Sequence, residues 1–166
     1  MERTNWPRSS RGSPDTAGGD GAPALRDAAQ ILADAEVDEA ASDQARERYR
    51  TQPMATLEPD PRIAPLLAPG ERVVAVRRSA VLDRRQPVLG SGAPTGLTGD
   101  LYLTSRRLVL VGRYTLSFDL EAIEEAMLSG EQLLLVMRDG EGASLGVTPP
   151  RLMRVEIAAT RLAARG

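Results

Sequence analysis

The chain has 166 residues, a length that favours one domain with an additional segment. It contains no Cys and no His, and all 21 basic residues are Arg. These absences exclude disulfides, Cys-ligated metals, His-based catalysis and Lys Schiff bases. We therefore expect a protein that is not an enzyme, has no metal site and needs no cofactor.

The charge differs between the two parts of the sequence. Residues 1–65 carry 8 Arg against 12 acidic residues, a net charge of −4, whereas residues 66–166 carry 13 Arg against 11, a net charge of +2. Neither value approaches the basic balance of a nucleic-acid-binding domain, so we expect no nucleic-acid partner. Apolar runs are too short for a membrane span, and the first residues lack the apolar stretch of a signal peptide. These features predict a cytoplasmic location.

Three segments precede the expected domain. Residues 1–23 are rich in Ser, Gly, Pro and Asp and predict a disordered tail. Residues 24–50 predict a charged helix, because no Gly or Pro interrupts them and their acidic residues precede their Arg residues, as the helix dipole favours. The apolar stripe of this helix is narrow, which leaves a solvated helix and a partner-binding or dimerising helix as alternatives. Residues 51–65 contain four Pro and predict a linker that adds nothing to the apolar core.

From residue 66 onward, turn signals divide the sequence into short apolar pieces. The clearest piece is 113–120, where Tyr114, Leu116, Phe118 and Leu120 alternate with polar residues. Such alternation indicates a half-buried antiparallel strand. The full set of expected strands is 71–82, 99–104, 107–111, 113–120, 124–128, 132–138 and 143–147.

A helix is expected over residues 149–165, with Thr148 placed to cap its first turn. One face of this helix is apolar and is expected to lie against the sheet. Its members are Leu152, Val155, Ala159 and Leu162. The order of strands followed by one helix predicts an α+β meander that forms a barrel or sandwich.

Two stretches of the domain resemble the GRAM and bacterial PH-like families. The first is the Pro-Gly-Glu entry at residues 67–71, and the second is the hairpin GDLYLTSRRLVLVG at residues 99–112. Leu120 and Ile123 match a later leucine-x-x-isoleucine step. The resemblance covers residues 66–166. It implies a PH-like antiparallel β-barrel or sandwich of about seven strands closed by a C-terminal helix, and a non-enzymatic role in binding protein or lipid.

Two groups of Arg residues are candidate sites. Residues 83–98 predict a long loop that, by the resemblance, borders an anionic-ligand site. Together with neighbouring guanidinium groups it could bind an anion or a partner, and a solvated loop is the alternative. The candidate anion-site residues are Arg77, Arg84, Arg85 and Arg107. The candidate basic stripe on the last helix, with a solvated face as its alternative, is Arg151, Arg154, Arg161 and Arg165.

Arg107 also belongs to the turn pair Arg106-Arg107. For this pair we expect a structural role, either hydrogen bonding within the turn or pairing with Asp100 or Asp119, with ligand contact as the alternative. The favoured function is a protein–protein adaptor whose partner is unknown. The alternative is a peripheral membrane module that binds anionic lipid headgroups weakly through the Arg-rich first loop. Arginines that are scattered or paired with carboxylates would favour the adaptor, and an open basic patch would favour the lipid module.

Overall fold

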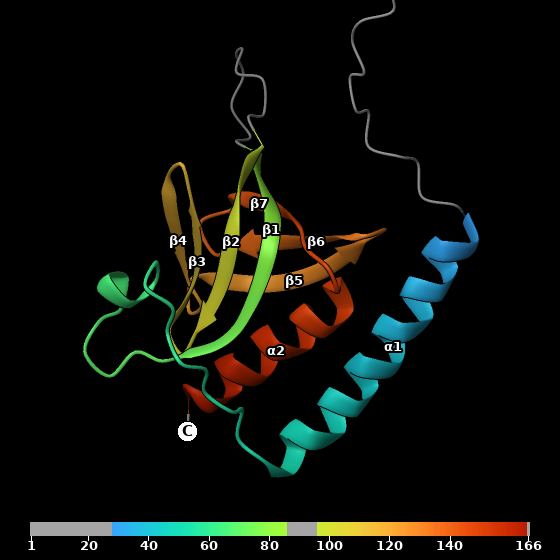
Figure 1. Cartoon of the computed structure of the whole chain (residues 1–166), viewed down its shortest axis with the longest axis horizontal. Coiled ribbons are helices and arrows are strands. Elements are labelled where there is room, and N and C mark those ends of the chain that lie inside the picture. The colour runs from blue at the N-terminus through green and yellow to red at the C-terminus, as the bar shows by residue number, and fades with distance from the viewer. Residues whose placement is uncertain (1–27, 86–95, 166) are drawn as a thin grey trace, which may run out of the picture.

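The computed structural model describes residues 28–85 and 96–165 (Figure 1). The predicted tail 1–23 and most of the predicted loop 83–98 lie outside the described residues, as do the side chains of Arg84 and Arg85. The elements are α1 (Ala28–Thr51), a short 3-10 helix (Ala64–Leu66), β1 (Val73–Arg85), β2 (Leu97–Thr104), β3 (Arg107–Gly112), β4 (Thr115–Asp119), β5 (Ile123–Ser129), β6 (Gln132–Met137), β7 (Gly142–Gly146) and α2 (Pro150–Ala163).

The strands form one antiparallel sheet in the order β4-β3-β2-β1-β7-β6-β5. β1 joins the two halves of this sheet, since it pairs with β2 from Val73 to Leu82 and with β7 from Val81 to Arg85. A register shift before Ala80 and a positive φ of 55° at Ser79 interrupt the strand where it gains this second partner. The two outer strands, β4 and β5, do not pair with each other, so the sheet is not closed into a barrel.

The α+β prediction is confirmed, and the arrangement is consistent with a PH-like sandwich. β1 continues to Arg85 and β2 begins at Leu97, so the connection between them is shorter than the predicted loop 83–98. Figure 1 shows α2 below the sheet and α1 beside α2.

The main core lies between the two halves of the sheet and α2. Phe118 is buried in this core and Ser117 is exposed, which confirms the predicted alternation from Leu116 to Leu120. Tyr114, expected on the same apolar face, lies before β4 and is 58% exposed. The expected apolar face of the last helix is wrong, because Met153 and Ile157 enter the core whereas Leu162 is 71% exposed. α1 covers a second side of α2, so the helix has two covered sides and a single apolar stripe does not identify the one that faces the sheet.

A second, smaller core lies on the outer face of β1, β2 and β3. The segment 53–67, which we call the strap, crosses this face and places Ile63 against Tyr102 and Val109 with no exposed surface. A single bridge between Leu57 and Val73 fixes the start of the strap to β1. The expectation that residues 51–65 add nothing to the apolar core is therefore wrong at Ile63.

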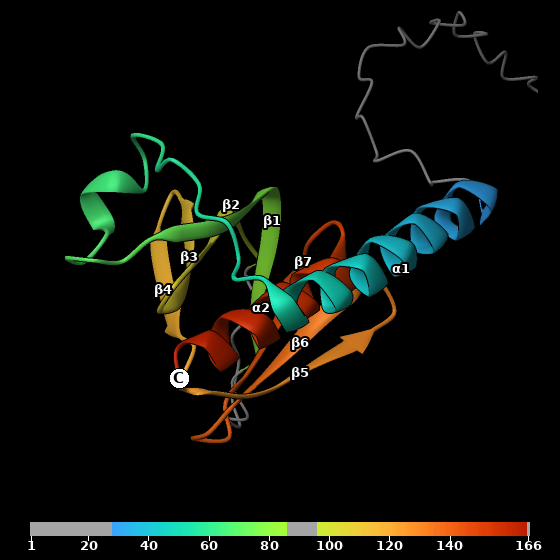
Figure 2. The same cartoon turned by 90° about the horizontal axis from the view of Figure 1, so that it is seen from below.

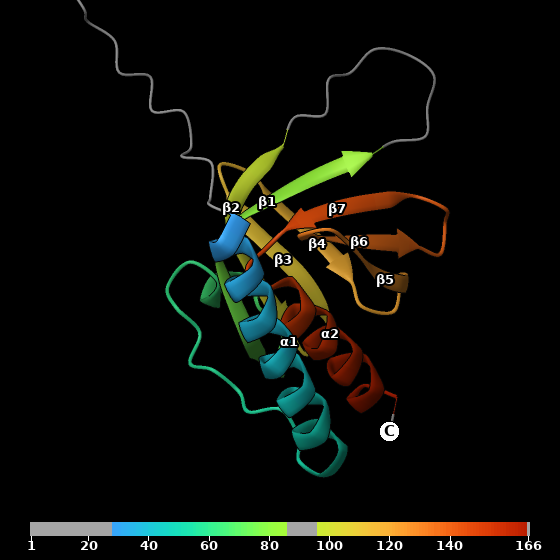
Figure 3. The ribbon, with the colours of Figure 1, turned by 90° about the vertical axis from the view of Figure 1, so that its right-hand side faces the viewer.

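Helix α1 packs on the domain along α2, as Figures 2 and 3 show from two directions. Its contact face is made of small and polar residues, with Asp38, Ser42 and Ala45 buried. Close packing through small side chains explains why the apolar stripe of this helix is so narrow in the sequence.

Candidate functional site

The candidate anion-site residue Arg77 is engaged inside the molecule. Its side chain reaches from β1 to α2 and donates to Glu156 at 2.5 Å, and only 12% and 10% of the two side chains are exposed. Burial raises the pKa of Glu156 although the Arg77 guanidinium opposes the rise. Arg77 Nε is buried and has no hydrogen-bond partner. This guanidinium is therefore a structural cation beneath α2, inaccessible to a headgroup.

The neighbouring Arg78 points to the opposite side of β1, as strand alternation requires. It donates to Asp100 at 2.5 Å and to Asp60 of the strap at 3.2 Å. Tyr102 donates to the same Asp60 at 2.7 Å, and this hydrogen bond is the main reason why the pKa of Asp60 is lowered. Arg62 of the strap also donates to Asp100, at 2.7 Å. Each guanidinium of this cluster faces a carboxylate, and together they fasten the strap to the sheet.

Arg107, the other described candidate of the anion site, is held by Glu71. Its Nε and Nη2 donate to the two carboxylate oxygens of Glu71 at 2.9 and 3.1 Å, and Thr104 donates to Glu71 at 2.6 Å. Burial alone would raise the pKa of Glu71, but these hydrogen bonds and one from the Ala68 N–H lower it to about 2. The expected hydrogen bonding of the turn is present, because the backbone N–H groups of Arg106 and Arg107 donate to the Thr104 hydroxyl at 3.2 and 2.9 Å. The ion-pair partner of Arg107, however, is Glu71 instead of Asp100 or Asp119.

The Glu71–Arg107 contact also explains the sequence pattern that resembles the GRAM and PH-like families. Glu71 belongs to the Pro-Gly-Glu entry, and Thr104 and Arg107 belong to the hairpin. The three residues form one hydrogen-bonded clasp at the base of β1, β2 and β3. These three residues of the pattern are therefore explained by their contacts within the fold.

The basic stripe of α2 is largely used to cover the edge of β5. Arg154 donates to the carbonyl of Ala126 at 2.9 Å, and Arg161 donates to the carbonyl of Glu124 at 3.4 Å. Arg151 pairs with Glu39 of α1 at 2.6 Å. Covering the unpaired carbonyls of an edge strand prevents it from pairing with another chain. Three of the four predicted stripe residues thus have intramolecular partners, and only Arg165 has none within the described residues.

The N-terminus of α2 is capped by α1. The expected cap, Thr148, makes no side-chain hydrogen bond to the helix. Instead, the carboxylate of Asp38 accepts hydrogen bonds from the backbone N–H groups of Arg151 at 2.7 Å and Leu152 at 2.9 Å. A carboxylate at this position satisfies two unpaired donors and interacts favourably with the helix dipole. Because Asp38 is far away in sequence, local capping rules could not identify it.

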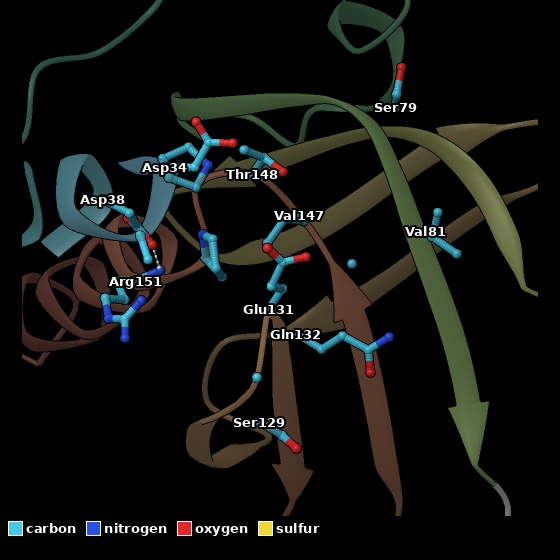
Figure 4. A pocket seen from close by; sticks show the side chains of 15 residues that line it. Asp34, Asp38, Ser79, Val81, Ser129, Glu131, Gln132, Val147, Thr148 and Arg151 are labelled. Carbon is cyan, nitrogen blue, oxygen red and sulfur yellow. Dashed lines mark hydrogen bonds between the residues drawn. The ribbon is translucent and has the colours of Figure 1, made fainter. Parts of the chain in front are cut away.

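A pocket of about 590 Å³ opens beside this cap (Figure 4). Its walls come from α1, from the bend of β1, from the turn between β5 and β6, and from the connection between β7 and α2. Polar side chains on these walls include Asp34, Ser79, Glu131 and Gln132, and apolar surface comes from Val81, Val147 and the two Pro residues before Arg151. Figure 4 shows Glu131 extending from the β5–β6 turn into this space.

The charges of the pocket favour a cationic ligand group. Asp38 is occupied by the cap, Arg151 is paired with Glu39, and Asp34 accepts a hydrogen bond of 2.7 Å from Gln30. The exposed carboxylate of Glu131 is therefore the charge that the pocket offers to a ligand. Ser79, on the wall formed by β1, has a φ of 55°, a conformation that costs a non-glycine residue free energy and that is frequent at binding sites. The β1 bend that makes this pocket gives no signal in the sequence, because Ser79 is not a glycine.

Other kinds of site are not found in the described residues. Within residues 28–85 and 96–165, no group of three or more acidic side chains could hold a metal ion. In the same part of the chain, no helix is long and apolar enough to cross a membrane.

Comparison with known proteins adds little to this geometry. No family model matches the sequence, and no curated protein is similar to it. Among solved structures, the chain resembles the crystal structure of the C-terminal domain of an unknown protein from Leishmania infantum, with 14% sequence identity and a TM-score of 0.45. The similarity covers 60% of this chain and 91% of that one.

Proposed function

We propose that this protein is a non-enzymatic, PH/GRAM-like binding module that acts as a protein–protein adaptor. The observation that supports the proposal is that both described arginines of the candidate anion site form ion pairs inside the molecule. Arg77 is paired with Glu156 and Arg107 with Glu71, so neither described guanidinium is available to an anionic headgroup. A sequence without His, Cys and Lys supports a binding role over catalysis.

The binding surface that we propose for the partner is the pocket beside α1. The carboxylate of Glu131 attracts a Lys or Arg side chain, and the hydroxyl and amide groups of the pocket offer further hydrogen bonds. An apolar side chain of the partner could contact Val81, which is 40% exposed. It could also contact Ile31, which lies one turn before Ala35 in α1 and is 37% exposed. The partner segment is therefore expected to combine a basic residue with an apolar one.

A selection of random displayed peptides on the full chain tests this proposal. We expect enrichment of sequences that contain Lys or Arg beside an apolar residue. Ala35→Arg places a bulky cation in the pocket wall and should weaken the binding of selected peptides at least tenfold. Ala33→Arg is the matched control, because Ala33 is exposed on α1 and does not line the pocket, and it should leave binding unchanged.

Three outcomes would contradict the proposal. They are a failure to enrich any peptide, enrichment of acidic peptides, and equal losses of binding in the two Arg variants. The alternative function, binding of anionic lipid headgroups through Arg84 and Arg85, is tested separately with vesicles.

A further inference from the structure

The two outer strands of the sheet, β4 and β5, differ in how their outer edges contact the helices. The carbonyls of Glu124 and Ala126 on β5 accept hydrogen bonds from arginines of α2. β4 lies at the other end of the strand order, and in Figure 1 it is on the side of the sheet away from α1. Of the two α-helices, neither lies beside β4 in Figures 1 and 2.

The hydrogen bonds between β3 and β4 show which backbone groups of β4 face outward. Gly112 N donates to the carbonyl of Tyr114, and Leu120 N donates to the carbonyl of Arg106. The backbone N–H and C=O groups of successive residues point to alternate sides of a strand. Those of Leu116 therefore also point toward β3, whereas those of Thr115 and Ser117 point away from the sheet.

Features that normally block edge pairing are absent from this strand. Residues 114–118 contain no charged residue and no Pro, and the register between β3 and β4 runs without a bulge. A regular, uncharged edge strand is a template for pairing with another strand. β5, in contrast, carries Glu124 and Glu125 and is covered by α2.

The sequence of β4 is complementary to itself in one antiparallel register. If two copies meet about a two-fold axis at Leu116, Thr115 lies opposite Ser117, Tyr114 opposite Phe118, and Arg113 opposite Asp119. In this register the residues with outward backbone groups lie opposite each other, because Thr115 of one copy meets Ser117 of the other. These two hydrogen-bonded pairs give about four backbone hydrogen bonds across the axis.

The side chains match in the same register. Arg113 and Asp119 are both exposed, and neither forms a salt bridge to another described residue. Within one copy, Arg113 lies 5.6 Å from the centre of the Tyr114 ring and Asp119 lies opposite Arg107 of β3, so each side chain could still pair with its opposite in the second copy. Tyr114 is 58% exposed and would gain cover from the apolar face of the other β4. Thr115 and Ser117, both exposed, would meet on the outer face as a hydroxyl pair.

We propose that two copies of this chain associate through antiparallel pairing of their β4 strands, centred on Leu116, to form a continuous sheet. This surface is separate from the α1 pocket, and the inference does not depend on the proposed adaptor function. A symmetric dimer would present two such pockets to a partner.

Sedimentation of the full chain in the analytical ultracentrifuge, from micromolar to millimolar concentration, tests the association. We expect a reversible monomer–dimer equilibrium. Ser117→Pro removes an outward N–H that has no partner in the monomer, so it should abolish the dimer while the chain still folds. Ser117→Ala is the matched control and should dimerise like the wild type.

Charge exchange tests the register and does not depend on the Pro variant. Arg113→Asp alone and Asp119→Arg alone each place like charges opposite each other and should weaken dimerisation about five- to tenfold. The variant carrying both substitutions restores opposite charges and should recover the wild-type dissociation constant. A wild-type chain that stays monomeric throughout, or a double variant weaker than either single one, would overturn the inference.

Discussion

Asp38 of α1 accepts a hydrogen bond of 2.7 Å from the backbone N–H of Arg151, the residue that follows the first residue of α2. One helix thereby supplies the cap that the other lacks. The contact couples the predicted charged helix to the domain and forms one wall of the pocket.

Removal of this cap should destabilise the whole chain. Asp38→Ala leaves two backbone donors of α2 unsatisfied, and we expect the free energy of unfolding to fall by about 1–2 kcal/mol in urea denaturation. Asp43→Ala, on the same helix, removes only an exposed contact with Arg46 and should cost less than about 0.5 kcal/mol. Similar losses from the two substitutions would show that Asp38 is not the cap.

The acid stability of the protein should depend on Glu71. Its pKa is about 2 in the folded chain against an ordinary value of 4.5. A carboxyl group with a lowered pKa stabilises the fold above its unfolded value, and this contribution is lost as the pH falls through the folded value. The shift corresponds to about 3 kcal/mol, present above about pH 5 and lost between about pH 4.5 and 2.

Urea unfolding of the wild type and Glu71→Gln across this range measures the effect. The difference in unfolding free energy should be large at pH 7 and should shrink steadily below pH 4.5. Glu121→Gln, at an exposed position, should follow the wild type at every pH. A Glu71→Gln difference that is constant from pH 7 to pH 2.5 would argue against the clasp.

Removal of one partner of the buried Arg77–Glu156 pair should lower the free energy of unfolding strongly, whereas replacement of both partners by apolar residues should lower it little. Arg77→Met leaves Glu156 buried without its cation, and we expect a loss of about 3–5 kcal/mol in unfolding free energy. Adding Glu156→Leu removes the stranded carboxyl and should recover most of that loss. A second substitution that deepens the loss would mean that the pair itself stabilises the fold.

The side-chain alternation of β4 provides a matched comparison in the core. Phe118 is 8% exposed and its truncation to Ala should cost about 3–5 kcal/mol, because a cavity is left between the sheet halves. Ser117→Ala changes an exposed side chain and should alter the unfolding free energy by less than about 0.5 kcal/mol. Thermal or urea unfolding of both variants measures these losses. Equal losses of unfolding free energy in the two variants would contradict the assignment of Phe118 to the core face and Ser117 to the exposed face.

Local patterns in the sequence predicted most of the fold. Alternation located β4, and turn residues such as Gly130 and Gly140, which have φ of 60° and 85°, separated the later strands. The strap was missed because Pro61 and Pro65 flank Ile63 and no periodic pattern marks it as buried. The burial of Ile63 depends on contact with Tyr102, which is distant in sequence. The face of α2 was misassigned because α1 covers a second side.

The candidate site was harder to predict, because it depends on partners that are far apart in the chain. The sequence identifies Arg77 and Arg107 as cations but gives no sign that Glu156 and Glu71 neutralise them. In the same way, Asp38 looks like one acid among several on a charged helix until α2 is placed beside it. Long-range pairing of charges decides which arginines remain available, and this requires the fold.

We propose that the described candidate arginines, Arg77 and Arg107, serve the fold and leave no site for anionic lipid. Arg84 and Arg85 alone would supply about 1 kcal/mol each near an anionic surface, too little for stable attachment. Co-sedimentation of the full chain with vesicles rich in anionic lipid is the most direct measurement. We predict that the protein stays in the supernatant at physiological salt, with weak binding at low salt that disappears in the variant Arg84→Ala plus Arg85→Ala. Tight, salt-resistant sedimentation with the vesicles would contradict the account.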